Sequence, residues 1–293
     1  MDYIDFHADD YAQSRHNSER ILELVELGRL DSISILANMT GYEDFMALLS
    51  ERWESLAVKP LLSVHLNYIN GFHLSGREGE IQEHSWGQLF LRSFLPGGGR
   101  KQLQRELTEE FKTQIGRVYA DLPEGCALRL DSHLHIHMIP VVFDAMLAAI
   151  DELGLAGELS YVRLSSEPLL MFLTTPGVAG TYPPINLVKN LILNILSPRA
   201  IRILENRGID YHYTCGLCLS GQTDKERIHI LLPKLQRFAR KKGHAIEVLM
   251  HPGRMLPEEV MPETGSASDL AFLLSENREL EYEGARFRYG YEE

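Results

Sequence analysis

The sequence has few cysteines, no long hydrophobic run and no recognisable leader. Three cysteines in 293 residues are too few for a disulfide scaffold. No apolar stretch reaches about 18 residues, so no transmembrane helix is expected. The first residues lack the basic and apolar regions of a signal peptide. These absences predict a cytoplasmic protein without a membrane span.

Positive charge is also scarce. The chain has 29 Lys and Arg against 41 Asp and Glu, a formal net charge of −12. Nucleic acids are bound mainly through neutralisation of phosphates by Lys and Arg. The one basic run, from Arg237 to Lys242, fits the polar face of a helix. We therefore expect no nucleic-acid partner and no attraction to anionic membranes.

What is present is a globular composition, with 44% hydrophobic and 24% charged residues, and a regular alternation of apolar and amphipathic segments. Short apolar runs predict strands at 3–7, 32–38, 61–66, 127–131, 160–164, 211–219 and 245–250. Amphipathic segments predict helices at 14–27, 42–56, 102–121, 142–153, 185–206 (with a break at Pro198), 224–241 and 266–276.

Strands that alternate with helices favour a parallel sheet with helical crossovers. The fold class is therefore α/β, with a (β/α) barrel-like architecture, either a distorted or a seven-stranded TIM-type barrel. A doubly wound open sheet is the alternative. We expect a single domain over 1–293, with a long irregular insertion loop at about 70–100; the tail at 282–293 has no predicted place.

Metal-binding or proton-transferring side chains follow four of the predicted strands. The strand ends are His7-Ala8-Asp9-Asp10, His65, the segment Asp131-Ser132-His133-Leu134-His135-Ile136-His137, and His251-Pro252-Gly253. In a barrel, catalytic residues lie at the carboxyl ends of the strands. The four segments are far apart in the sequence, so their meeting at one rim would indicate an active site.

The adjacent carboxylates of Asp9 and Asp10 repel each other and need a cation or a shared proton. In an extended segment they point to opposite sides, so that one could bind a metal while the other faces a water molecule. The alternative is that Asp10 caps the following helix.

Three histidines, His133, His135 and His137, lie at every second position, which in an extended segment places them on one face. Imidazole is the commonest protein ligand of divalent transition metals, and a ligating ring needs its second nitrogen held, by another His or by Asp131. The alternative is a set of hydrogen-bonded core histidines. His65 alone also fits a core histidine, and His251 alone is undecided. Cys215 and Cys218 lie in an apolar strand and are predicted to pack in the core.

These segments resemble the YdjC-like carbohydrate deacetylases, including chitooligosaccharide deacetylases and a hopanoid-associated branch. The similar blocks are HADDYAQSRHNSERILELVELGRLDSISILANM at the start, VHLN at His65, LDSHLHIHMIP at Asp131 to Pro140, YTCGLCLSG within Tyr211 to Gly221, and EVLMHPG at Glu247 to Gly253. Together they span about 2–253 in the family's order. One departure is Ala12, where the family usually has glycine.

The resemblance implies a barrel-like fold and a hydrolase that removes an N-acetyl group from an amino sugar or oligosaccharide with one divalent metal ion, Mg or Zn. It implies Asp10, His65 and His133 as metal ligands, Asp9 as general base and His251 as general acid or as a group that contacts the acetyl. Asp131, His135 and His137 would support the ligands. Tyr68, Trp86 and Tyr182 lie in predicted rim loops, where they could stack on a sugar ring or be ordinary surface aromatics.

Other functions remain open at this point. A phosphoesterase or amidohydrolase would use the same rim; a phosphoesterase needs cationic residues near the metal, for which Arg129 and Arg163 are candidates. A non-catalytic carbohydrate-binding protein would tolerate the loss of Asp9 or His251, both of which are present. The oligomeric state is open, a homodimer being one alternative.

Overall fold

The computed structural model describes residues 4–94, 96 and 98–291. In this part of the chain seven strands form one parallel sheet in the order β5-β4-β3-β2-β1-β7-β6. The strands are β1 (Ile4–Tyr11), β2 (Ser32–Ile35), β3 (Leu61–Leu66), β4 (Leu128–Ser132), β5 (Leu159–Val162), β6 (Tyr213–Cys215) and β7 (Ile246–Met250). The predicted (β/α) barrel-like fold is confirmed, and β1 lies between β2 and β7.

The sheet curls so that its two edge segments meet. The backbone N–H of Val162 donates to the carbonyl of Asp210 at 3.1 Å, and that of Leu164 donates to His212 at 3.0 Å. Further along, Thr214 donates to Ser166 at 3.1 Å. These bonds satisfy backbone groups that an open sheet would leave exposed at its edges.

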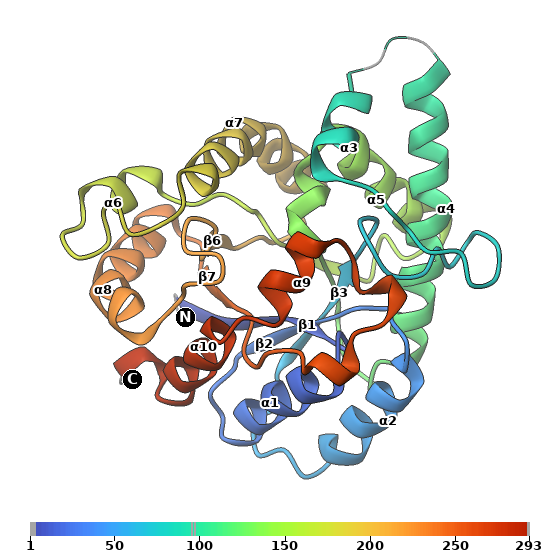
Figure 1. Ribbon diagram of the computed structural model, residues 1–293. Helices are drawn as coiled ribbons and strands as arrows, with labels where there is room; N and C mark the ends of the chain where they lie inside the picture. The colour runs from blue at the N-terminus through green and yellow to red at the C-terminus, as the bar shows by residue number, and fades with distance from the viewer. Residues whose placement is uncertain (1–3, 95, 97, 292–293) are drawn as a thin grey trace.

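Helices surround the strands, as Figure 1 shows, and α9 lies in front of the strands in that view. The helices are α1 (Arg15–Glu26), α2 (Tyr42–Trp53), α3 (Trp86–Arg92), α4 (Gly98–Asp121), α5 (Pro140–Glu152), α6 (Leu169–Thr174), α7 (Pro184–Arg207), α8 (Lys225–Lys242), α9 (Ala267–Leu273) and α10 (Asn277–Arg286). Short 3₁₀ helices are η1 (His133–Met138), η2 (Pro257–Glu259), η3 (Pro262–Thr264) and η4 (Arg288–Gly290). Within the described residues no helix is both long and apolar enough to cross a membrane.

The first helix illustrates how local sequence and core packing agree. The Ser14 hydroxyl accepts a hydrogen bond from the backbone N–H of Asn17, which caps α1. The cap is therefore Ser14, and the alternative in which Asp10 caps this helix is wrong. One face of α1 is buried against the core, through Ile21, Leu22, Leu24 and Val25.

Some predictions of local structure are wrong. The insertion at 70–100 is not wholly irregular, since it contains α3 and the start of α4. Pro198 does not break α7. A proline has no backbone N–H, so Pro198 cannot donate the usual helical hydrogen bond to the Asn194 carbonyl. That carbonyl accepts a hydrogen bond from the Ser197 hydroxyl at 2.9 Å instead. Two predicted strands are shorter than expected, because β2 ends at Ile35 and β6 ends at Cys215.

The unplaced tail belongs to a second C-terminal helix. The predicted helix at 266–276 corresponds to α9, and α10 follows it and reaches Arg286. The 3₁₀ helix η4 comes next, with Tyr289 fully buried. Tyr3, expected to begin the first strand, and residues 292–293 of the tail lie outside the described residues.

Candidate functional site

The predicted strand ends meet inside the barrel at the carboxyl ends of β1, β3 and β4. Parallel register places His65 beside Asp131 on the neighbouring strands β3 and β4. Between β1 and β3 lies β2, whose inward side chains are small serines. The Ser34 hydroxyl bonds both Asp131 and, at 2.6 Å, the Nε2 atom of His7. Small residues on β2 therefore leave room for larger polar side chains of the flanking strands to approach one another.

Asp10, His65 and His133 form a compact group of potential metal ligands. Oδ1 of Asp10 lies 3.2 Å from Nδ1 of His133 and 3.5 Å from Nε2 of His65. All three side chains are buried or nearly so, and the ligand atoms of the three lie within 4.8 Å of one another. Oδ2 of Asp10 is buried, and no described residue forms a hydrogen bond with it. One carboxylate and two imidazoles suit a divalent transition metal, so the residues fit the implied ion.

The second nitrogen of His65 is held by Asp131. Its Nδ1 atom lies 2.6 Å from Oδ1 of Asp131, and both side chains are buried. A carboxylate that accepts the Nδ1 proton leaves Nε2 free as a ligand atom, as metal-binding histidines require. Asp131 thus has the supporting position expected from the sequence.

Backbone strain at Asp10 accompanies this geometry. The φ angle of Asp10 is +67° and that of Ala12 is +73°, and the pairing of β1 with β2 shifts register between Ala8 and Tyr11. The left-handed conformation is costly for residues with a side chain and is often found at functional sites. Ala12 adopts the conformation that glycine takes without steric cost, so the turn forms here despite the departure from the family's glycine.

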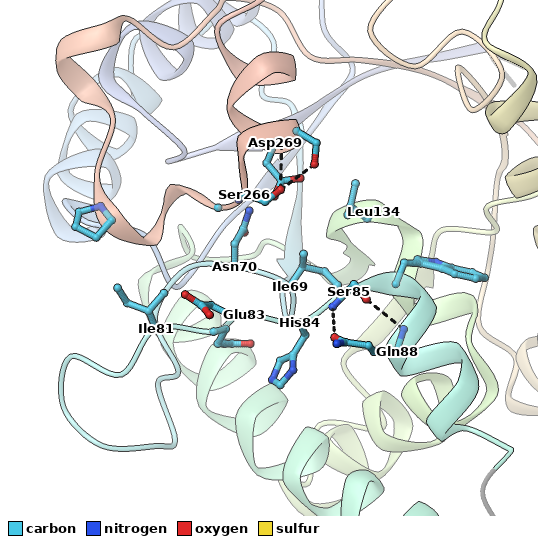
Figure 2. A pocket seen from close by; sticks show the side chains of 15 residues that line it. Ile69, Asn70, Ile81, Glu83, His84, Ser85, Gln88, Leu134, Ser266 and Asp269 are labelled. Carbon is cyan, nitrogen blue, oxygen red and sulfur yellow. Dashed lines mark hydrogen bonds between the residues drawn. The ribbon is translucent and has the colours of Figure 1, made fainter.

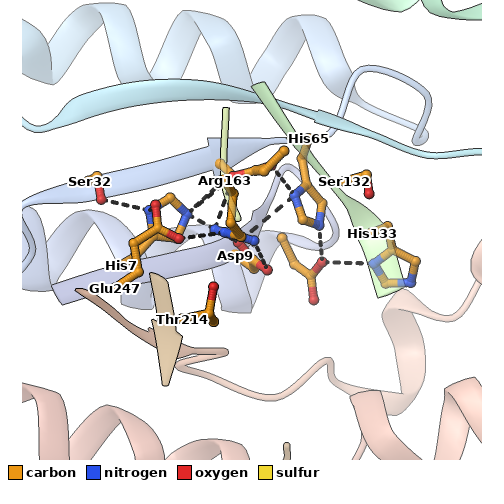
Figure 3. A network of polar contacts seen from close by, with 12 residues as sticks. His7, Asp9, Ser32, His65, Ser132, His133, Arg163, Thr214 and Glu247 are labelled. Atoms are coloured by element: carbon orange, nitrogen blue, oxygen red, sulfur yellow. Dashed lines mark hydrogen bonds and ion pairs between the residues drawn. The ribbon is translucent and has the colours of Figure 1, made fainter. Parts of the chain in front are cut away.

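The neighbouring carboxylate, Asp9, has different partners. Its two oxygens lie 2.8 and 3.0 Å from the Nη atoms of Arg163, and Nε2 of His7 lies 3.1 Å from Oδ1 (Figure 3). Burial on its own raises the pKa of Asp9, but the charge of Arg163, with His65 and His7, outweighs it and holds the pKa well below its usual range. Asp9 is therefore an anion at neutral pH.

Arg163 balances several buried acids at once. Its Nη2 atom lies 3.0 Å from Oδ2 of Asp131, and its Nε atom donates to Glu247 on β7. Two further clusters of potential ligands, Asp5-His212-Glu247 and His7-Asp9-Asp131, include acids that already pair with a guanidinium. Arg129, the other cationic candidate, stacks on Tyr161 at 3.7 Å and lies 3.8 Å from Asp5. Both arginines, Arg129 and Arg163, thus already contact buried acids inside the barrel.

The three histidines after β4 do not share one face, which corrects the extended-strand expectation. They lie in η1, where Leu134 and His135 have φ angles of +51° and +60°. His133 faces Asp10, whereas Nδ1 of His135 lies 3.0 Å from the Ser165 hydroxyl. His137 is fully buried and lies 2.6 Å from the Ser132 hydroxyl. The sharp turn thus gives the three rings separate neighbours.

A cavity of ≈ 110 Å³ opens beside this group. Its lining includes Asp9, His133 and His251, together with Phe272 from α9 and Lys189 from α7. His251 follows β7, and its backbone N–H donates to Oε2 of Glu281 at 2.7 Å. Its Nδ1 atom is buried and has no hydrogen-bond partner within the part of the chain that the structure describes. Burial lowers the pKa of the ring below its ordinary value, against the opposing charges of Asp10 and Glu281. Both predicted proton-transfer residues therefore line one cavity with a candidate ligand.

A larger cavity of ≈ 600 Å³ adjoins the first, with which it shares Asn70, Leu134 and Asp269 (Figure 2). Its walls come from the segment 69–88, which belongs to the insertion, and from 262–269. Trp86 lines this cavity. Tyr68 and Tyr182 are buried: Tyr68 stacks on His84 at 4.5 Å, and the Tyr182 hydroxyl donates to the Phe172 carbonyl at 3.1 Å.

Two cationic residues near the site are missed by sequence reasoning. Arg278 of α10 is fully buried, and its Nη1 atom lies 3.6 Å from Oδ2 of Asp10. Lys189 lines the cavity from the first half of α7. Neither follows a strand, so the strand-end rule does not find them; only the packing of α7 and α10 brings them to the rim. Arg163, which the sequence analysis named as a candidate cation, directly follows β5.

Comparison with known proteins identifies a family and solved structures with a similar fold. The model of a family described as YdjC-like protein matches residues 3–284. None of the curated proteins matches the chain. A crystal structure of a proposed cellobiose-phosphate cleavage protein from Enterococcus faecalis V583 is 15% identical, covers 97% of this chain and 94% of that chain, and superposes with a TM-score of 0.54. At that identity the likeness concerns the fold.

Proposed function

Since the family match spans nearly the whole chain, the protein belongs to the YdjC-like family, and we propose that it is a metal-dependent hydrolase that removes an N-acetyl group from an amino sugar or oligosaccharide. One observation carries this proposal. The Asp10-His65-His133 group lies beside a cavity that Asp9 and His251 also line. A ligand set, an anionic base and a second proton-transfer group next to one cavity are what amide hydrolysis requires.

Asp10, His65 and His133 would hold the ion, which we expect to be Zn or Mg. A divalent cation at that position supplies Lewis acidity, which polarises a carbonyl and lowers the pKa of water. Asp131 keeps His65 in the tautomer with a free Nε2 atom. Arg278 lies next to Oδ2 of Asp10, whose Oδ1 faces the two histidines, and so favours binding through Oδ1.

Asp9 would act as the general base. The bidentate contact with Arg163 fixes the plane of its carboxylate, and ionisation makes it a hydrogen-bond acceptor for water in the cavity. Attack of that water on the acetyl carbon transfers a proton toward Asp9. The amine nitrogen is a poor leaving group until it is protonated. His251, on the same cavity, would deliver that proton from its imidazolium form and return to the neutral ring.

The larger cavity would hold further sugar units. It adjoins the reaction cavity through Asn70, Leu134 and Asp269, and the indole of Trp86 offers an apolar surface within it. Tyr68 and Tyr182 are buried by their neighbours, so we assign the stacking role to Trp86 alone.

Phosphoester hydrolysis remains the second candidate because of Lys189. Arg129 and Arg163 are engaged by buried acids, but Lys189 brings a cation to the cavity, as phosphoester hydrolysis requires. The family match favours the deacetylase, since deacetylation is what the resemblance to this family implies.

The test is acetate release from a panel of N-acetylated sugars, including chitobiose and longer chitooligosaccharides, with added divalent metal and again with chelator. We expect chelator-sensitive release of acetate from at least one sugar. Release of inorganic phosphate from sugar phosphates, with no acetate from any sugar, would replace the deacetylase with the second candidate.

A further inference from the structure

Helix α7 carries apolar side chains on the side that faces solvent. Its inner side is buried through Asn190, Leu193, Ser197, Ala200 and Leu204. At 100° per residue, the residues on the opposite side are the half or more exposed Ile185, Val188, Leu191 and Ile195. A surface helix normally turns polar residues outward, and a helix that is apolar all round is normally covered on all sides. The outer side of α7 therefore has the character of a buried surface.

The apolar surface continues onto α6, which packs beside α7 at the edge of the molecule (Figure 1). Leu170 and Leu173 of α6 are 74% and 45% exposed. A groove of ≈ 620 Å³ lies between the helices, and its lining includes Leu170 of α6 and Pro198 of α7. Of the fifteen large hydrophobic residues exposed in the described part of the chain, six form this α6–α7 face: Leu170, Leu173, Ile185, Val188, Leu191 and Ile195.

Acidic residues are absent from the sequence of this region. The chain has 41 Asp and Glu in 293 residues, about one in seven, yet the 37 residues from 168 to 204 contain none. Two copies of a protein with a net charge of −12 repel each other, and the repulsion is weakest where neither surface carries acids. Interface cores are likewise depleted of charged residues. The region is therefore suited to contact with a second copy of the chain.

The basic residues of the same stretch do not form a border around the face. Lys189 lines the cavity of the candidate site, Arg199 pairs with Asp144 of α5, and Arg202 lies two turns beyond Ile195. Helices that bind anionic membranes carry Lys and Arg along the flanks of their apolar side. A second copy therefore fits the face better than a membrane surface.

The spacing along α7 fits a symmetric helix pair. Ile185, Val188, Ile192 and Ile195 are separated by three, four and three residues, which is the spacing of a coiled-coil seam. The order of these separations is the same in both directions. In a two-fold dimer with antiparallel α7 helices, Ile185 would meet the partner's Ile195, and Val188 would meet the partner's Ile192. Each contact would occur twice, as two-fold symmetry requires.

The size of the face also fits a dimer. A standard interface buries about 800 Å² per partner, and about 65% of this area is apolar in homodimers. Six side chains with these exposed fractions present on the order of 500 Å² of apolar surface. That area matches the apolar part of such an interface, and monomeric proteins rarely expose a continuous apolar patch of more than a few hundred Å².

We propose that the α6–α7 face is the interface of a two-fold symmetric homodimer in which the α7 helices of the two copies pack antiparallel. The inference does not depend on the proposed reaction, because none of the six residues of the face lines either cavity of the candidate site.

Sedimentation velocity of the full chain at about 1 to 100 μM tests the dimer. We expect a species of twice the 33.3 kDa of one chain. Val188→Glu combined with Ile195→Glu should raise the dissociation constant about a hundredfold or more, because it places carboxylates in an apolar contact. Circular dichroism should be unchanged, since both positions are exposed. The matched control, Leu27→Glu with Val58→Glu, alters two exposed residues outside the face and should leave the dimer intact.

Cysteine cross-linking tests the antiparallel arrangement. A mixture of Ile185→Cys and Ile195→Cys proteins should form a disulfide-linked dimer on mild oxidation. Each variant alone should not, because identical positions would lie about 15 Å apart along the paired helices. Wild-type protein, with its three native cysteines, is the control.

Three results would overturn the interface: a monomer at every concentration, a dimer that persists in Val188→Glu with Ile195→Glu, or a monomer that binds vesicles of phosphatidylcholine and phosphatidylglycerol and loses that binding in the same variant. The third result would assign the face to a membrane surface. Cross-linking of Ile185→Cys protein alone would overturn the antiparallel pairing.

Discussion

Nδ1 of His65 and Oδ1 of Asp131 lie 2.6 Å apart on neighbouring strands, buried from solvent. This contact decides which nitrogen of His65 faces Asp10. It also ties the candidate metal group to the buried charges around Arg163, because Oδ2 of the same Asp131 lies 3.0 Å from that guanidinium. The ligand geometry and the charge balance of the barrel interior therefore depend on one carboxylate.

Asp131→Asn should weaken metal binding without removing a ligand. The amide can present an N–H group to Nδ1 of His65 and so disturb the tautomer, and loss of such a partner typically costs about 10- to 100-fold in affinity. The measurement is competition for the metal with a chelator of known affinity, alongside circular dichroism to confirm folding. Unchanged affinity in a folded variant would contradict the role given to Asp131.

Asp9→Asn should keep the metal and lose most of the turnover. Asp9 contacts Arg163 and His7 and is not part of the Asp10 group, so its charge matters for proton transfer. We expect kcat to fall by about 100- to 10,000-fold with unchanged metal content, measured by acetate release and elemental analysis. If the variant is purified without metal, Asp9 belongs among the ligands instead.

His133→Ala should lose metal and activity together, whereas His135→Ala should keep the metal. The pair is a matched control because both rings lie in η1, but only His133 approaches Oδ1 of Asp10, at 3.2 Å. Elemental analysis after dialysis gives the result directly. Equal metal content in the two variants would refute this ligand set.

Glu167 should make the protein less stable as the pH rises from about 4.5 to 7. Burial raises its pKa from an ordinary 4.5 to about 7, against the opposing hydrogen bonds from Gly216 and Cys218. Between those values the unfolded chain releases the proton and the folded chain keeps it, so the free energy of unfolding falls, by about 3 kcal/mol in all, and levels off above pH 7.

Urea unfolding of the wild type and of Glu167→Gln at pH 5 and pH 8 isolates this effect, because other groups titrate equally in both proteins. The wild type should lose more stability between the two pH values than the variant. Parallel behaviour of the two proteins would show that Glu167 keeps an ordinary pKa in the fold.

Much of the fold follows from local patterns in the sequence. Apolar runs and amphipathic segments are sufficient to predict the strands and the barrel. The strand-end rule predicts that the segments of Asp10, His65 and His133 meet, whereas the choice of these three as ligands came from the family resemblance. The arrangement of His135 and His137 could not be predicted, since the left-handed turn in η1 depends on contacts with Ser132 and Ser165 that form only in the folded chain.

The positions of Lys189 and Arg278 at the site could not be predicted for a different reason. Each lies on a helix whose sequence resembles an ordinary surface helix, and each reaches the site through the way that helix packs. The docking of α7 depends on Asn186 and Asn190, and the neighbours of Arg278 include Phe272, whose ring lies 5.2 Å from its guanidinium. No short motif encodes such contacts.

The position of β1 between β2 and β7 has a consequence for how the protein is made. During synthesis β1 can pair with β2 early, but it gains its other neighbour only when β7 has been made, and Arg278 is made later still. Until then one edge of β1 is unpaired, and Asp10 lacks its contact with Arg278. The nascent chain is therefore unable to assemble the site, and its exposed strand is the segment that would most need shielding from aggregation during translation.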